Sequence, residues 1–205
     1  MSTFMKNSAQ QGLWDYIENG QIQQVVDAII KDPKQLNYKQ GLSEDSPLHV
    51  IAMKGDVAMM KAILEVIDPK ALETRNKAGD TPLMKAGAYG QADMAVFLMD
   101  SGADPNASNI LQETLLMKTI KGRNQDDVRD SDKPPFDRIL ETAIDRGANI
   151  AAKNSTGNTA SDFADLFDDA KTMRFLETKQ AEQKAGTSKL ASGAPPKPVT
   201  SSKFG

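Results

Sequence analysis

Residues 81–106, TPLMKAGAYGQADMAVFLMDSGADPN, decide the fold. Thr81 can cap a helix with its hydroxyl, and Pro82 suits the first helical position because its missing N–H would have no partner there. Gly90 suits the left-handed residue that ends a helix. A second stretch with apolar residues at helical spacing follows, and residues 102–106 turn the chain back. The stretch therefore predicts two packed helices between tight turns.

The motif that opens this stretch recurs along the chain. Ser46-Pro47-Leu48-His49 lies 35 residues before Thr81-Pro82-Leu83-Met84, and Thr114-Leu115-Leu116-Met117 lies 33 residues after it. Gly55 follows the first copy at the distance at which Gly90 follows the second. A period near 33 residues indicates stacked units that bury their apolar faces against one another.

The period, the Ser/Thr-Pro-Leu opening and the Gly-Ala-Asp-Pro-Asn loop at 102–106 resemble the ankyrin repeat. The resemblance implies an all-α solenoid of helix-turn-helix units over residues 1–180. Terminal units should depart from the pattern because the ends of a stack face water. The sequence suggests five units, the first and last degenerate, near residues 8–31, 42–73, 77–107, 110–152 and 155–179.

The fourth unit departs most from the pattern. Leu115 replaces the turn proline, and Gly122, expected to end the first helix, falls one residue early. An insertion at residues 122–135 lies between the two expected helices, where a solenoid tolerates extra residues. Its acidic residues do not have the spacing of a calcium loop, so a solvated loop or a partner contact is expected rather than a metal site. They are Asp126, Asp127, Asp130 and Asp132.

Composition limits the classes of function. The 205 residues contain no cysteine, which removes disulfides and thiolate chemistry and fits the cytosol. Residues 181–205 are rich in Gly, Ser, Pro and Lys and are expected to be disordered. These residues carry a net charge of +3, whereas the whole chain carries −3, so the remaining residues carry −6. An acidic body repels phosphate, so nucleic acid is not an expected partner. No secretory signal or membrane span is indicated.

Catalytic chemistry has no support in the sequence. No phosphate loop, dinucleotide turn, zinc-protease helix or nucleophile elbow occurs, and no cofactor is expected. His49 is the single histidine, and at this position of an ankyrin repeat it is expected to hydrogen-bond between turns. We therefore expect neither catalytic nor metal-binding residues.

The resemblance implies a monomeric module that binds another protein through its hairpin loops and the concave face of its first helices. Variable surface positions of the family map onto Leu42, Ser43, Asp45, Ala78, Ala88, Ile110 and Leu111, among others. Tyr89 is the preferred contact, since exposed aromatic side chains beside charges anchor many interfaces. The expected partner-binding residues are Met53, Lys54, Lys77, Asp80, Lys85, Tyr89, Glu113 and Lys121.

Two other classes of function stay open. Short ankyrin proteins with a flexible polar tail resemble some bacterial effectors, in which case residues 181–205 would be the secretion signal and the protein would enter a host cell. The tail could also be a linker. Its Pro195-Pro196-Lys197-Pro198 has the spacing of a ligand for an aromatic groove, although such matches are common by chance. An enzyme of unfamiliar arrangement is the third class. A cytoplasmic adaptor is the preferred interpretation.

Overall fold

The computed structural model describes residues 8–125 and 133–191, with side chains for 12–125 and 133–185. All its regular elements within these ranges are helices, which confirms the expected all-α class. They are α1 (Ser8–Glu18), α2 (Ile22–Lys31), η1 (Pro33–Asn37), α3 (Pro47–Lys54), α4 (Val57–Leu64), η2 (Pro69–Glu73), α5 (Pro82–Ala88), α6 (Ala92–Asp100), α7 (Leu115–Arg123), α8 (Pro134–Asp145), α9 (Ala160–Leu166) and α10 (Ala170–Ala191).

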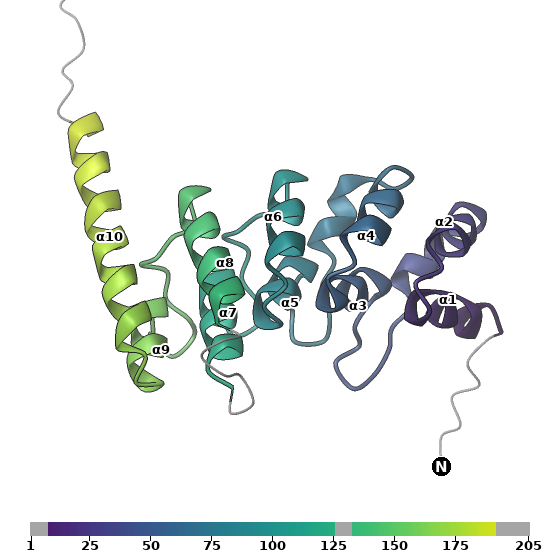
Figure 1. Cartoon of the computed structure of the whole chain (residues 1–205), viewed down its shortest axis with the longest axis horizontal. Coiled ribbons are helices and arrows are strands. Elements are labelled where there is room, and N and C mark those ends of the chain that lie inside the picture. Colours follow the sequence, from purple (N-terminus) through teal and green to yellow (C-terminus); the bar gives the residue numbers. More distant parts are fainter. Residues whose placement is uncertain (1–7, 126–132, 192–205) are drawn as a thin grey trace, which may run out of the picture.

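The helices stack in pairs into an elongated solenoid. Figure 1 shows the first helices of the pairs in one row and the second helices in another, from α1 and α2 to α9 and α10. In the central units the first helices pack more closely on one another than the second helices do. Because the more closely packed row lies on the inside of a curved stack, the first helices line the concave side.

Helix boundaries follow the expected local chemistry. Thr81 Oγ1 accepts a hydrogen bond from the backbone N–H of Met84 at 3.3 Å, and Pro82 occupies the first helical position. The chain leaves α3 at Gly55 with φ +72° and follows α5 with Gly90 at φ +67°, both left-handed. The stop signals assigned to these two glycines are therefore confirmed.

The core lies between the two rows of helices and runs through the whole stack. First helices contribute Leu48, Leu83 and Leu116, while second helices contribute Met60 and Leu98, all fully buried. These side chains belong to one continuous apolar cluster that begins at the first unit and ends at the last. Each unit is therefore stabilised mainly by its neighbours, as expected for a repeat protein.

Gly122 has a different role from the one expected. It does not end α7 but lies inside it, and the helix continues to Arg123. A Cβ at Gly122 would lie 2.0 Å from the carbonyl oxygen of Ala88, at the end of α5. The glycine is needed because the two helices approach so closely, which local sequence reasoning did not reveal.

The two helices of the fourth unit are tied to the last unit by a buried arginine. Arg123 Nε donates to Asp137 Oδ1 of α8 at 2.8 Å, and its Nη1 contacts the carboxylate of Asp169. Asp169 also caps α10 through the N–H of Thr172. Lys171 completes the cluster on Asp137 at 2.9 Å. The insertion between α7 and α8 therefore begins and ends beside a firmly held cluster, although its residues 126–132 lie outside the described part of the chain.

Helix α10 continues to Ala191, beyond residue 181, where the tail was expected to begin. Gln183 Nε2 donates to the carbonyl of Ala148 at 3.2 Å. The stretch from 170 is rich in Ala, Lys, Glu and Gln, which favour helix and outweigh the single Gly186. The rest of the predicted tail, residues 192–205, lies outside the described residues.

Candidate protein-binding surface

The loops between successive units form hairpins whose tips are joined by backbone hydrogen bonds. Lys77 N–H donates to Ser43 O at 2.9 Å, and Ile110 N–H donates to Ala78 O at 3.0 Å. Ser155 N–H continues the series to Leu111 O at 2.8 Å. Four hairpin tips therefore form one continuous edge along the stack.

An asparagine holds each of the last three tips. Asn76 Oδ1 accepts the N–H groups of Ala78 and Asp80, and Asn109 Oδ1 accepts those of Leu111 and Glu113, all at 2.9–3.0 Å. Asn154 does the same in the last hairpin. Sequence reasoning missed these residues. The signal was present, since each asparagine stands five residues before the threonine that opens the next helix.

His49 joins the second unit to the third. Its Nδ1 accepts from the N–H and hydroxyl of Ser46, at 3.2 and 2.7 Å, so Nε2 carries the proton and donates to Asp80 O at 2.8 Å. Burial lowers the pKa of His49 below 6.5, against smaller opposing effects of Asp80 and Asp45. The expected bonding between turns is confirmed.

A row of carboxylates lies beneath the concave side, and each is paired with a lysine. Lys85 Nζ lies 3.0 Å from Asp45 Oδ2, and Lys118 Nζ lies 2.9 Å from Asp80 Oδ2. In both cases the lysine comes from the following unit. In the fourth unit Lys121 Nζ lies 2.9 Å from Glu113 Oε1 of the same unit. The side-chain amide of Asn76 also donates to Asp45 Oδ1 at 2.7 Å, and that of Asn109 donates to Asp80 Oδ1 at 2.8 Å.

Three of the expected contact residues are therefore not surface residues. Asp80, Glu113 and Lys85 are buried, because each is used in these interactions between and within units. The carboxylates hold the lysines and the hairpins in position, so they support the surface without being part of it.

The other five expected contact residues reach the surface. Tyr89 is 53% exposed, and its ring centroid lies 5.7 Å from Lys85 Nζ. Lys54 pairs with Glu18 at 2.9 Å, and Lys77 lies 3.9 Å from Glu44. Met53 is partly exposed. Lys121 has its ammonium 5.6 Å from the ring centroid of Phe163.

Exposed apolar side chains gather on this same side. Eight large hydrophobic side chains are exposed among the described residues, and only Ile30 and Val66 belong to or follow second helices. The other six form two rows, one on the hairpin tips and one at the ends of first helices. They are Leu42, Ile110 and Leu111 on the tips, and Tyr89, Leu166 and Phe167 at the helix ends. Leu166 and Phe167 were missed in the sequence because the last unit is degenerate there.

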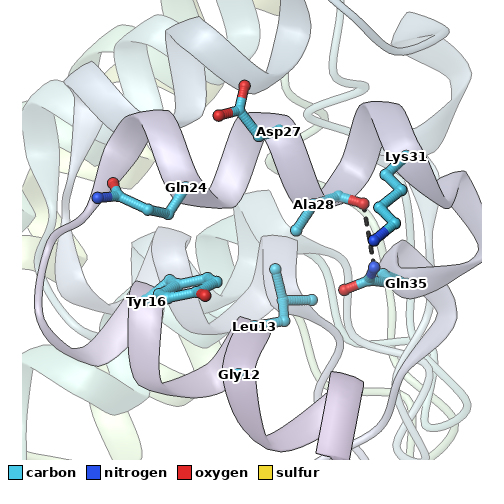
Figure 2. Close-up of a pocket in the computed structure, with 8 residues that line it drawn as sticks. All are labelled: Gly12, Leu13, Tyr16, Gln24, Asp27, Ala28, Lys31 and Gln35. Atoms are coloured by element: carbon cyan, nitrogen blue, oxygen red, sulfur yellow. Dashed lines mark hydrogen bonds between the residues drawn. The ribbon is translucent and has the colours of Figure 1, made fainter.

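A groove also lies away from the hairpins, at the first unit of the described stack. Figure 2 shows a groove of about 380 Å³ between α1 and α2, at the outer end of the stack, with Leu13 and Tyr16 rising from α1. Gln35 closes it by donating Nε2 to Ala28 O at 3.0 Å. The polar side chains around it suit the water-facing end of a repeat array. Nowhere in the described residues do three or more His, Cys, Asp or Glu side chains converge as a metal site would require.

The described residues define a helical-repeat solenoid with a hairpin edge and a concave row of first helices. Residues 13–109 match the family model for ankyrin repeats in three copies, and this chain is an ankyrin-repeat protein. Over 95 residues it is 37% identical to Ankyrin repeat and KH domain-containing protein 1 of Homo sapiens, covering 46% of this chain and 3% of that protein. It is 36% identical over 88 residues to Ankyrin repeat domain-containing protein 17 of Homo sapiens, covering 43% of this chain and 3% of that one.

Each of these relatives is far longer than the matched segment, so the likeness concerns the repeats alone. Ankyrin repeats are generally modules for protein–protein interaction. Within residues 8–125 and 133–191, no helix combines the length and apolarity needed to cross a membrane.

Proposed function

We propose that this chain binds a partner protein, as a monomer, through the side that carries the hairpin tips and the ends of the first helices. This side is called the binding face below. The observation that supports the proposal most directly is that six of the eight exposed large hydrophobic side chains of the described residues lie there. Exposed apolar groups cost solvation free energy, and their clustering on one side of a protein marks interaction surfaces.

The buried row beneath the binding face supports the same proposal. Ion pairs, asparagine bonds and tip-to-tip backbone bonds fix the face before any partner arrives. A preformed surface loses less conformational entropy on binding than a flexible one does. We therefore keep Met53, Lys54, Lys77, Tyr89 and Lys121 as contact residues, add the exposed aliphatic residues of the tips, and assign Asp80, Lys85 and Glu113 to support.

Matched substitutions test the proposal. The full chain and the variants Ile110→Ser, Tyr89→Ala and Ile30→Ser are used as baits for lysate proteins, and the retained proteins are quantified by mass spectrometry. Both isoleucines are exposed, but Ile110 lies on a hairpin tip and Ile30 near the end of a second helix. We expect a partner that is depleted by Ile110→Ser and by Tyr89→Ala but retained by Ile30→Ser.

Equal retention of every specific partner by all three variants, with folding confirmed by circular dichroism, would argue against the binding face. Loss of the partner with Ile30→Ser alone would indicate that the interface lies on the second helices. Catalysis is not part of this proposal, since the family is one of binding modules.

A finer alternative is delivery of the chain into a host cell as a bacterial effector. The human relatives do not bear on this alternative, and residues 192–205 lie outside the described part. It stays a prediction, and its test is a translocation assay that compares the full chain with residues 1–180. Translocation that survives the deletion would remove residues 181–205 as the signal.

A further inference from the structure

In the order of the repeats, Lys121 of α7 stands in the unit between those of two exposed aromatic residues, Tyr89 after α5 and Phe167 after α9. Tyr89 and Phe167 each stand eight residues after the threonine that opens their helix, and Gly122 occupies that position in α7. Gly122 has no side chain, and α7 lies against Ala88 of α5. At this position of the repeat, α7 therefore contributes no side chain between the units of Tyr89 and Phe167. Lys121, the preceding residue, supplies the cation at this level of the stack.

In two ion pairs of this region the positive charge is the more exposed one. The side chain of Lys121 is 41% exposed, whereas that of its partner Glu113 is 5% exposed. The neighbouring pair has the same orientation, with Lys118 19% and Asp80 5% exposed. Although each pair is neutral as a whole, its cation lies outermost, so an approaching charge meets the ammonium first. The aligned pairs thus favour an anionic group.

The two carboxylates of α9 do not lie beside Lys121 in the repeat pattern. Asp162 accepts from the N–H and hydroxyl of Thr159 at the start of the helix, both at 2.7 Å. Asp165 stands six residues after Thr159, and the equivalent Gly87 of α5 packs toward the following helix, where an added Cβ would meet Leu115 and Thr119. Among the described residues no helix pair follows the last unit, so this row lies on the outer end of the described stack. Asp165 therefore does not cancel the positive charge at Lys121.

We infer that this part of the binding face takes a linear acidic segment of the partner protein. In this arrangement a carboxylate of the segment pairs with Lys121, and apolar side chains on either side of it pack on Tyr89 and on Leu166 with Phe167. The inference rests on the proposed function and specifies the partner's chemistry. Lys121 is suited to this role because Phe163 beneath it and Glu113 behind it hold its ammonium in place.

The probe is a library of random linear peptides displayed on phage and selected on the immobilised full chain. Enriched peptides are synthesised, and their dissociation constants are measured at low and high salt. The test variant is the double substitution Glu113→Gln with Lys121→Gln, which removes the ammonium without leaving a buried carboxylate unpaired. Leu166→Ala tests the apolar border. Lys61→Gln is the matched control, because Lys61 is an exposed lysine on α4.

We expect the enriched peptides to share an acidic residue flanked by apolar residues. Their affinity should fall on the order of tenfold with the double substitution and with replacement of the peptide's acidic residue by its amide. It should also fall at high salt and stay unchanged with Lys61→Gln.

Peptides that lose affinity with Tyr89→Ala or Ile110→Ser but bind the double variant equally well would overturn this inference and leave the proposed function standing. Failure to enrich any peptide would also overturn it, because the face would then not accept a linear segment. Peptides insensitive to every substitution on the binding face would count against the inference and the proposed function together.

Discussion

At the residue scale, His49 shows how one side chain joins two units. Both ring nitrogens are used in the neutral form, one as acceptor from Ser46 and one as donor to the carbonyl of Asp80. A second proton on the ring would remove the acceptor. The lowered pKa of His49 expresses the same constraint, since burial disfavours the charged ring.

This histidine should make folding stability sensitive to mild acid. Below pH 6.5 the unfolded chain binds a proton that native His49 does not, so the free energy of unfolding falls as pH falls toward the lowered native pKa. One proton limits the slope to about 1.4 kcal/mol per pH unit. Urea denaturation at a series of pH values from neutral to mildly acidic measures it.

His49→Gln is the control, because His49 is the only histidine in the chain. This variant should be less stable at neutral pH and should lack the histidine part of the slope. Parallel curves for the two proteins would show that His49 does not set the pH dependence.

Gly122 provides the second residue-scale prediction. Glycine to alanine in a helix usually stabilises by about 0.5–1 kcal/mol. At Gly122 the new Cβ would meet the backbone of Ala88, which cannot rotate away, so α7 must move from α5. We expect Gly122→Ala to destabilise by roughly 2 kcal/mol or more. Gly12→Ala in α1, where the nearest atom is 4.0 Å away, should be neutral or stabilising in the same urea assay.

At the element scale, Arg123 is the connection among α7, α8 and α10. Burial alone would raise the pKa of Asp137, but hydrogen bonds from Lys171 and Arg123 outweigh it and lower that pKa. The carboxylate is therefore charged at neutral pH and paired on both sides. Removing the arginine would leave Asp169, which is buried, without its cation.

We expect Arg123→Met to destabilise by roughly 3–5 kcal/mol, since a buried carboxylate loses its charge partner while the apolar stem is kept. Hydrogen exchange should accelerate first in α8 and α10. Arg138→Met is the comparison, because the pair between Arg138 and Asp93 is exposed and should contribute about 1 kcal/mol or less. Similar losses for both variants would mean that the Arg123 cluster has no special role.

The elements also show what the sequence could predict. The helix pairs were predictable because the Ser/Thr-Pro opening and the left-handed glycine are local signals, and both appear at Thr81 and Gly90. The clash at Gly122 and the burial of Lys85 were not, because they depend on contacts with another unit. On the binding face, exposure of Tyr89 was predictable, whereas Leu166 and Phe167 fell where the repeat pattern fades.

At the scale of the whole molecule, stability is a sum of units and of the interfaces between neighbouring units. Asp80 contributes to two of these interfaces. Its backbone carbonyl accepts from His49 of the second unit, and its carboxylate accepts from Asn109 and Lys118 of the fourth. Loss of that carboxylate should weaken the link between the third and fourth units while the link to His49 is kept.

Trp14 allows this to be tested, because it is the only tryptophan and is buried in the first unit. In the natural chain, unfolding followed by its fluorescence and by circular dichroism should coincide. Asp80→Ala should cost roughly 2–4 kcal/mol and separate the two transitions, since the two ends of the stack then unfold with less coupling. Asp93→Ala removes an exposed carboxylate of the same unit and should leave the transitions together. Coincident transitions in Asp80→Ala would mean that apolar packing alone carries the cooperativity, and that the ion pairs serve only to shape the binding face.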